Sequence, residues 1–322
     1  METYPYKFAP IYKEKIWGGR NLERLFGRDL PADRPIGESW ELADLAEGVS
    51  RVSNGPARGI TLTDLTRELG SRLLGGAPTM ADGRFPLLLK LLDANDILSL
   101  QVHPDAAAVE AIGEGAALKT ECWYILESRD GMIYKGVLPD ISAEQFRQGI
   151  ETDTVDKLVK PYRVAEGDFH YLPAGTVHAL GAGVVVAEVQ TPSDTTYRVT
   201  DWGRGREIHV ERSMQCIHFT EADDVAPGEA GDTLLKTEFF TVTRRKASAG
   251  QAAAIPSGRC VALMMLEAQG PAEVRHAGPV EPTVPIRAGD TVLVPACLEN
   301  AEVVTSGNCT WLEVTLPERS SL

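Results

Sequence analysis

A pattern of turns and strands occurs twice in the chain, and the two copies align without a gap. Residues 167–178 read GDFHYLPAGTVH, and residues 289–300 read GDTVLVPACLEN. Each copy predicts a Gly-Asp turn, a short strand, a Pro-Ala turn and the start of another strand, because glycine, aspartate and proline punctuate β structure. A repeated supersecondary pattern is typical of a repeated unit. We therefore expect two related β-barrel units.

The C-terminal part of the sequence has the short apolar runs that a jelly roll requires. Between residues 234 and 316 such runs, for example CVALMML at 260–266, are separated by glycine and proline. The preceding stretch at 227–232 is poor in apolar residues and rich in turn formers. We place a domain boundary there, which divides the chain into residues 1–228 and 229–322.

Two segments break the β pattern and predict helices. Residues 62–75 repeat leucine at helical spacing and end at glycine. A second helical segment is expected over 142–158, where Ser142 can cap a helix and Gln145 follows three residues later. The expected fold class is therefore mainly β, with two jelly-roll β-barrel units and a small helical insertion.

Charge and cysteine content exclude several classes of protein. The 322-residue chain has a net charge of -14, which disfavours nucleic acid and anionic membranes as partners. Its five cysteines are scattered and never spaced Cys-x-x-Cys, which argues against a disulfide framework and against a zinc-thiolate site. The N-terminus does not resemble a signal peptide, and no segment has the roughly 18 apolar residues of a membrane span. We expect a cytoplasmic protein.

A strand with a chemically active face is expected over 97–105, which reads ILSLQVHPD. Apolar and polar residues alternate there, and side chains two positions apart on a strand point the same way. The carboxamide of Gln101 and the imidazole of His103 would then project side by side from a rigid backbone. Such a pair can hold a metal.

Glu121 and His178 are candidates to complete a metal site. Taken alone, a glutamate in a strand usually faces solvent, and a lone histidine is usually structural. Beside His103, however, they make two imidazoles and a carboxylate, a recurrent ligand set for Zn²⁺ or Fe²⁺ that leaves positions open for substrate. His170 is not expected to be a ligand, because its strand alternates away from the turn that sets His178.

The second copy of the repeat lacks these ligands. Asn300 stands where the first copy has His178, and nothing near residues 235–322 replaces His103 or Glu121. The C-terminal unit is therefore expected to be free of metal and structural.

Two charged residues interrupt otherwise apolar runs. Lys90 lies in FPLLLKLL at 85–92, and Glu188 lies in VVVAEVQ at 184–190. Lysine is rarely buried without a reason. Lys90 either extends to the surface or faces a polar cavity and meets an anion. Glu188 either faces water at a strand edge or is partly buried, and burial would raise its pKa toward the range of a general base.

Four motifs, in this order, resemble the type I mannose-6-phosphate isomerases in their short bacterial form. They are FPLLLK at 85–90, LQVHPD at 100–105, KTECWY at 119–124 and LPAGTVHA at 172–179. The likeness runs from about Tyr12 to Trp202, and the C-terminal part is similar to the family's second cupin-like domain. The resemblance implies two cupin folds and a zinc-dependent interconversion of mannose 6-phosphate and fructose 6-phosphate, with one zinc ion per chain.

The resemblance also implies roles for individual residues. Arg198 lies near the position where the family keeps an arginine important for activity. The spacer between His103 and Glu121 is longer than a tight turn, so the geometry of that loop is left open. The implied metal ligands are Gln101, His103, Glu121 and His178, and the positions that line the pocket are Trp17, Glu38, Lys90, Lys119 and Arg198.

The chemistry of such an isomerase defines further roles. A proton moves between C2 and C1 through an enediol, which requires a base and a stabilised oxyanion. Glu188 is the candidate base, and Lys119 is a candidate donor to a sugar oxygen. Arg198 and Lys90 are candidates for the phosphate, for which the planar fork of arginine is well suited. Zn²⁺ would either polarise a sugar oxygen or only orient the substrate.

Two other classes of function remain open. Two histidines and a glutamate can hold Fe²⁺ in a dioxygenase, but such a site would not need Lys90, Lys119 and Arg198 around it. A sugar-binding cupin without catalysis is expected to have lost a ligand, which only the second copy has done. A sugar phosphate is thus the expected partner, bound by a monomer or a homodimer.

Overall fold

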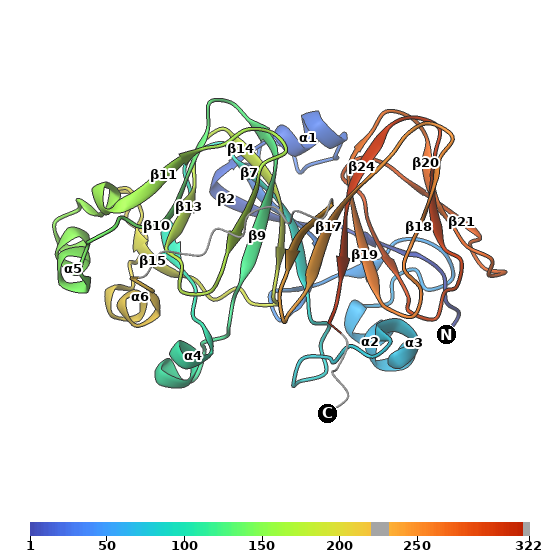
Figure 1. Cartoon of the computed structure of the whole chain (residues 1–322), viewed down its shortest axis with the longest axis horizontal. Helices are drawn as coiled ribbons and strands as arrows, with labels where there is room; N and C mark the ends of the chain where they lie inside the picture. Colours follow the sequence, from blue (N-terminus) through green and yellow to red (C-terminus); the bar gives the residue numbers. More distant parts are fainter. Residues whose placement is uncertain (220–231, 318–322) are drawn as a thin grey trace.

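The computed structural model describes residues 1–219 and 232–317. They form a mainly β structure of several antiparallel sheets, and four of these sheets follow one another along the long axis of Figure 1. The predicted domain boundary between residues 228 and 229 lies outside the described residues. Within the described ranges, no helix combines the length and the apolar character needed to cross a membrane.

A six-stranded sheet forms the centre of the N-terminal part. Its middle strands, β7, β9 and β14, are largely buried, as their apolar runs predict for a sheet covered on both faces. The strand order is β12 (Phe169–Leu172), β9 (Glu121–Ser128), β14 (Val184–Gln190), β7 (Leu88–Ala94), β3 (Ile36–Leu42) and β2 (Ile11–Gly19).

A five-stranded sheet covers one face of the six-stranded sheet. Trp123 from one sheet and Ile133 and Leu180 from the other belong to a single buried core. The strand expected over 97–105 is shorter than predicted, because Pro104 has no N–H for a sheet and α4 begins two residues later. The strand order is β11 (Val159–Arg163), β10 (Met132–Val137), β13 (His178–Leu180), β8 (Leu100–Val102) and β15 (Tyr197–Thr200).

The C-terminal part contributes a seven-stranded and a four-stranded sheet, which enclose a second core around Trp311. The seven-stranded sheet has the order β16 (Thr233–Lys236), β17 (Thr241–Ala247), β24 (Cys309–Thr315), β19 (Val261–Ala268), β22 (Thr291–Val294), β1 (Tyr6–Ala9) and β6 (Arg51–Val52). The four-stranded sheet has the order β18 (Ala252–Ala254), β23 (Glu302–Thr305), β20 (Ala272–Arg275) and β21 (Thr283–Ile286). A small hairpin joins β4 (Asp44–Leu45) and β5 (Gly48–Val49).

Two strands from the N-terminal part complete the seven-stranded sheet. β1 pairs with β22, where Tyr6 stands opposite Leu293, and β6 pairs with the other side of β1. The largest core lies between the six-stranded and seven-stranded sheets and joins, for example, Leu91 to Met264. The two parts of the chain therefore share one hydrogen-bonded sheet and one core. Their division at residues 228 and 229 stays a prediction.

The helices agree with the predicted segments. The segment 62–75 forms α2 (Leu62–Leu69) and α3 (Ser71–Leu74). The segment 142–158 forms α5 (Ala143–Glu151) and a 3-10 helix, η1 (Val155–Leu158), and Ser142 and Gln145 make the predicted capping box. The remaining helices are α1 (Asn21–Phe26), α4 (Ala106–Ile112) and α6 (Val210–Cys216), and α4, α5 and α6 lie at the outer end of the N-terminal part (Figure 1).

The predicted repeat is confirmed in its first strand and its Pro-Ala turn, whereas the following strand begins at His178 in the first copy and only at Glu302 in the second. β12 and β22 occupy the same positions of the two aligned copies. In the Pro-Ala turns, Thr176 N donates to Pro173 O at 3.0 Å, and Leu298 N donates to Pro295 O at 3.1 Å. The similar local sequence thus builds the same strand and Pro-Ala turn twice.

Candidate metal site and cavity

The candidate metal ligands come from both sheets of the N-terminal part. His178 is the first residue of β13 and pairs with Gln101 in the middle of β8, while His103 follows β8 directly. Glu121 is the first residue of β9 in the facing sheet. The three candidate residues His103, Glu121 and His178 therefore meet between the sheets, which explains how residues far apart in the sequence reach one place.

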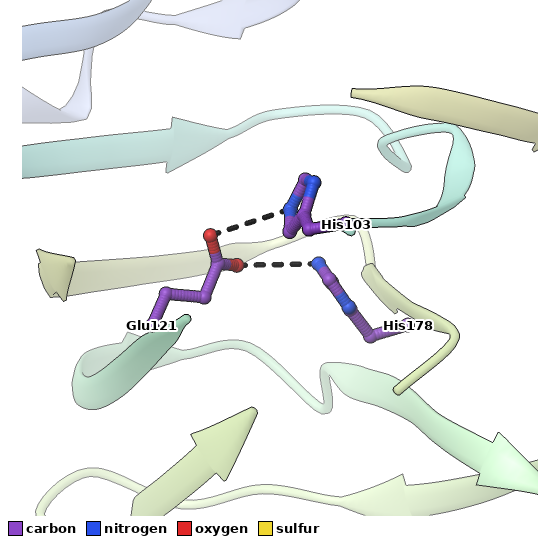
Figure 2. Close-up of side chains that lie close together, drawn as sticks. All are labelled: His103, Glu121 and His178. Carbon is purple, nitrogen blue, oxygen red and sulfur yellow. Dashed lines mark ion pairs between the residues drawn. The ribbon is translucent and has the colours of Figure 1, made fainter. Parts of the chain in front are cut away.

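Figure 2 shows the two imidazoles on one side of the Glu121 carboxylate. His103 Nε2 lies 3.4 Å from Glu121 Oε2, and His178 Nε2 lies 3.2 Å from Glu121 Oε1. The three possible ligand atoms all lie within 4.8 Å of one another, and all three residues are buried. This spacing is suitable for a common divalent cation.

The backbone sets the orientation of both imidazoles. His103 Nδ1 donates to the carbonyl of Thr195 at 2.9 Å, and His178 Nδ1 donates to the carbonyl of Thr176 at 2.8 Å. Because a carbonyl can only accept, both Nδ1 atoms carry the hydrogen, and both Nε2 lone pairs point toward Glu121. Carbonyl partners of this kind are usual for histidines that bind metals.

The charge state of the site also suits a cation. Burial and the charge of Lys119 lower the pKa of His103 to about 3, so its imidazole is neutral at neutral pH. Burial acts to raise the pKa of Glu121, but Lys119 and His103 hold it well below its ordinary value. Within the described part of the chain, His103 Nε2 and both oxygens of Glu121 are buried without a hydrogen bond. Such buried atoms are costly unless a ligand satisfies them.

Gln101 lies beside the three ligands but presents its nitrogen to them. Its Nε2 is 3.4 Å from His178 Nε2, and its Oε1 lies 3.4 Å from the hydroxyl of Ser99. The amide would have to turn over to offer its oxygen to a cation. Gln101 is therefore in place as a fourth ligand but not in a ligating orientation.

A cavity of about 350 Å³ lies beside the site, because Gln101 and Lys119, which line it, are next to His178 and Glu121. All the residues predicted for catalysis or substrate binding line it, together with Gln101, so the structure brings the predicted set together. The predicted residues that line the cavity are Trp17, Glu38, Lys90, Lys119, Glu188 and Arg198. The other lining residues are Lys15, Leu92, Leu98, Ser99, Asp194, Thr196, Arg206, Glu207 and His209.

Lys90 is held between two carboxylates on one wall of this cavity. Its Nζ lies 3.1 Å from Glu188 Oε1 and 3.9 Å from Glu38 Oε2. Burial acts against the charge of Lys90, but the two carboxylates outweigh it and raise the pKa. Lys90 is only 3% exposed, so the interpretation in which it extends to the surface is wrong.

Glu188 is buried, and the interpretation in which it faces water is wrong. It is 2% exposed, and its Oε2 accepts a hydrogen bond of 2.8 Å from the indole of Trp123. Burial raises the pKa of Glu188, and the charge of Glu121 raises it further, against the opposing effect of Lys90. This agrees with the direction expected for a buried general base.

The opposite wall carries arginines, only one of which was predicted. Arg198 Nη1 donates to the carbonyl of Glu207 at 2.7 Å, and its buried Nε makes no hydrogen bond among the described residues. Arg206 is held by the buried carboxylate of Asp201, with Nε 3.0 Å from Oδ2. This wall therefore carries two guanidinium groups, and the Nε of Arg198 is a donor without a partner among the described residues.

Sequence reasoning missed Lys15, Asp194, Arg206 and His209. A signal was present for Lys15, because it alternates with Trp17 along β2 and so shares its face. Lys15 Nζ pairs with Glu38 Oε1 at 2.8 Å. No comparable signal marks Arg206, since its segment is irregular.

Known proteins are similar to this chain over most of its length. Residues 6–133 match the family model described as phosphomannose isomerase type I, catalytic domain. Mannose-6-phosphate isomerase ManA of Bacillus subtilis is 34% identical over 316 residues, covering 92% of this chain and 94% of its own. A mannose-6-phosphate isomerase of Streptococcus mutans is 40% identical, covering 71% of this chain and 74% of its own. A crystal structure of the mannose 6-phosphate isomerase from Bacillus subtilis superposes with a TM-score of 0.85 at 30% identity, covering 96% of this chain and 99% of that one.

Proposed function

The chain belongs to the type I phosphomannose isomerase family, and we propose that it interconverts mannose 6-phosphate and fructose 6-phosphate. The reaction is an aldose-ketose isomerisation. The convergence of His103, Glu121 and His178 beside a cavity with cationic side chains carries this proposal. A phosphorylated sugar needs both features, because its reacting end requires stabilisation of an oxyanion and its phosphate requires cations.

The metal in this proposal is one Zn²⁺ ion per chain, held by His103, Glu121 and His178 with Gln101 as a fourth ligand. Two imidazole nitrogens and a carboxylate are donors that suit zinc, and the atoms that would bind it are buried without hydrogen bonds among the described residues. A bound zinc ion would polarise a sugar oxygen or orient the sugar. The side chains of the cavity would bind the phosphate and transfer the proton.

Arg198 is the proposed anchor for the phosphate. Its guanidinium faces the cavity beside Arg206, and its Nε is free to donate among the described residues. Lys90 is a poorer candidate than it was from sequence, because Glu188 and Glu38 already neutralise it. We assign Lys90 to holding these two carboxylates in place, and Trp17 and Glu38 to contacts with the sugar.

Glu188 is the proposed base that moves the proton between C2 and C1. Its raised pKa favours accepting a proton from carbon and returning it, and the Trp123 indole orients its carboxylate. Lys119 is the proposed donor to the sugar oxygen on which charge develops. It lies 3.1 Å from Glu121 and lines the cavity, so one ammonium group can face both the ligand set and the sugar.

The finer description of the fold is also a proposal. The pairing of a six-stranded with a five-stranded sheet, and of a seven-stranded with a four-stranded sheet, supports two cupin-like jelly-roll units over 1–228 and 229–322. We propose a cytoplasmic protein, monomeric or homodimeric, without nucleic acid or membrane partners. The net charge of -14 supports the last point.

The test is a metal analysis of the purified protein combined with a coupled assay of fructose 6-phosphate formed from mannose 6-phosphate. We expect one zinc ion per chain, turnover of the substrate, loss of turnover when a chelator removes the metal, and recovery when zinc is restored. Metal-loaded protein that does not turn over mannose 6-phosphate, or activity that survives complete removal of metal, would contradict the proposal.

A further inference from the structure

The turns that carry His103 and His178 are tied together by a ring of hydrogen bonds. Gly175, three residues before His178, donates its N–H to the carbonyl of His103 at 2.9 Å. The N–H of His218 donates to the carbonyl of Gly175, also at 2.9 Å. The side chain of His218 closes the ring by donating from Nε2 to Asp105 Oδ2 at 2.8 Å, and Asp105 is two residues after His103. One residue thus contacts both ligand-bearing turns.

The fit of His218 against Gly175 is close. Gly175 has a φ of +87°, and a Cβ atom there would lie 2.6 Å from atoms of the His218 ring. Only glycine satisfies both the backbone conformation and the space. The imidazole therefore covers the turn that leads to His178 as well as bonding across it.

Asp105 is shared between His218 and a helix. Its Oδ1 accepts from the N–H of Ala108 at 2.8 Å and caps α4, while its Oδ2 accepts from His218. His218 itself follows α6 by two residues. The ring therefore connects the turn after His103 to two helices of the outer end, α4 and α6.

We infer that His218 is a positioning residue for the metal site, which clamps the turns of His103 and His178 at the separation a metal requires. The inference rests on the proposed metal-binding function. His218 does not contact a candidate ligand side chain; it acts through Gly175 and Asp105. Groups that orient ligands in this way change metal affinity without belonging to the ligand set.

The test compares the zinc affinity of wild type, His218→Ala and His218→Phe by competition with a chromophoric chelator. Phenylalanine keeps a ring over Gly175 but cannot donate to Asp105. Because the imidazole is about half exposed, both variants should fold, which thermal unfolding without metal would verify. We expect both to bind zinc about tenfold more weakly and to regain near wild-type turnover at saturating zinc. Cobalt-loaded variants should also show a changed absorption spectrum.

Two further variants make the result specific. His218→Gln retains an N–H donor and should recover part of the lost affinity. Arg147→Ala breaks the ion pair between Arg147 and Glu211, which ties α5 to α6, and should leave the zinc affinity unchanged. Unchanged affinity in both His218→Ala and His218→Phe would overturn the inference. Failure of the proposed function would be distinguishable, because the wild type itself would then bind no zinc or would bind zinc without turning over mannose 6-phosphate.

Discussion

Five strands of the six-stranded sheet have counterparts in the seven-stranded sheet. The order β12-β9-β14-β7-β3 in the first corresponds to β22-β19-β24-β17-β16 in the second. β9 and β19 both have eight residues, and β14 and β24 both have seven. The pairing of β9 with β14 and that of β19 with β24 also shift register at the same place, after Ile125 of β9 and after Met265 of β19. The duplication thus extends well beyond the repeat that is visible in the sequence.

The turns are duplicated as closely as the strands. The N–H of Gly167 donates to the carbonyl of Ile125 at 2.9 Å, and the N–H of Gly289 donates to the carbonyl of Met265 at 2.7 Å. Both glycines have a positive φ, near +90°, which other residues rarely adopt. The Gly-Asp turns are therefore duplicated, whereas the backbone differs at the candidate ligand: His178 begins β13, but Asn300 has a φ of +54° and β23 starts two residues later.

The two sheets differ in the side chains at equivalent positions. In the six-stranded sheet Glu121 pairs with Leu172, and the equivalent pair in the seven-stranded sheet is Val261 with Val294. Val261 therefore stands in place of Glu121, and the second sheet has no carboxylate at this position. Lys90 pairs with Glu188 across neighbouring strands of the first sheet, and Thr243 pairs with Glu313 at the equivalent place in the second. Thr243 therefore stands in place of Lys90. His178 corresponds to Asn300 in the sequence repeat. The two halves thus share a sheet scaffold and differ in a few side chains, which are those of the candidate site.

One feature of the first sheet persists in the second. Glu313 occupies the position of Glu188 and is also buried, and burial raises its pKa as it does for Glu188. Arg245 lies beside it, with Nε 3.9 Å from Glu313 Oε2. Glu313 and Arg245 therefore serve as matched controls for the residues of the cavity.

The largest effect is expected from making the first copy of the sequence repeat like the second at the candidate ligand His178, which corresponds to Asn300. His178→Asn removes one imidazole, and we expect loss of metal and a fall in activity of at least about 10⁴-fold, because several kcal/mol of charge stabilisation depend on the metal. Metal analysis and the coupled assay measure both. The reverse change, Asn300→His, should create no metal site, since Val261 supplies no carboxylate. Retention of metal by His178→Asn would show that the comparison misidentifies the ligands.

The second prediction concerns the two equivalent carboxylates. Glu188→Gln should lower kcat by about 10²–10³-fold while zinc stays bound, because a general base contributes an effect of this order. Glu313→Gln should leave kcat unchanged and alter only the thermal stability. The measurement is kcat from steady-state kinetics of the two variants, each checked for metal content. Equal effects on kcat would remove Glu188 from its proposed role.

The third prediction concerns cations. Arg198→Ala should raise KM for mannose 6-phosphate by about 10- to 100-fold, since a hydrogen bond to a charged group contributes roughly 1.5–3 kcal/mol. Arg245→Ala should leave KM unaltered, because it lies by Glu313 and not in the cavity. The measurement is the dependence of rate on substrate concentration. An unaltered KM and kcat in Arg198→Ala would show that Arg198 does not bind the phosphate.

The smallest effect concerns stability in acid. Burial acts to raise the pKa of Glu38, but Lys90 and Lys15 outweigh it and lower that pKa to about 2. The folded state thus binds the proton of Glu38 less readily than the unfolded state. The resulting stability is present above about pH 4.5 and is lost as the pH falls from there to about 2.

Glu38→Gln should remove this contribution. We expect a stability on the order of 2 kcal/mol lower at pH 6, a difference that shrinks toward pH 2, measured by denaturant unfolding of metal-free protein. The second sheet has Thr243 in place of Lys90 and should not contribute a matching dependence. A difference between wild type and variant that is constant over this pH range would contradict the assignment.

The sequence predicted much of the local structure and of the candidate site. Alternation placed Gln101 and His103 on one face, turn residues located β12 and β22, and Ser142 with Gln145 marked the start of α5. These signals are local, because periodicity and capping act within a few residues. The convergence of His103 with His178 was inferred from the chemistry of the ligand set and from the family resemblance, since no local rule joins segments so far apart.

Other features depended on contacts that no local signal reports. The pairing of β1 with β22 joins Tyr6 to Leu293, and only the packing of two sheets brings them together. The partners of Lys90 lie on separate strands, so the sequence left its environment open between surface and cavity. Arg206 was missed because the carboxylate of Asp201 holds it in a segment without regular structure.

The sequence by itself determined where strands and turns form, that the β pattern occurs twice, and which residues have the chemistry to bind a metal and a phosphate. Only the tertiary structure decided that the Nε2 atoms of His103 and His178 face one carboxylate, that Glu188 is buried against Lys90, and that His218 joins the two ligand turns. The reason is physical: side-chain alternation and turn preference depend on neighbouring residues, whereas burial and ion pairing depend on which strands lie side by side.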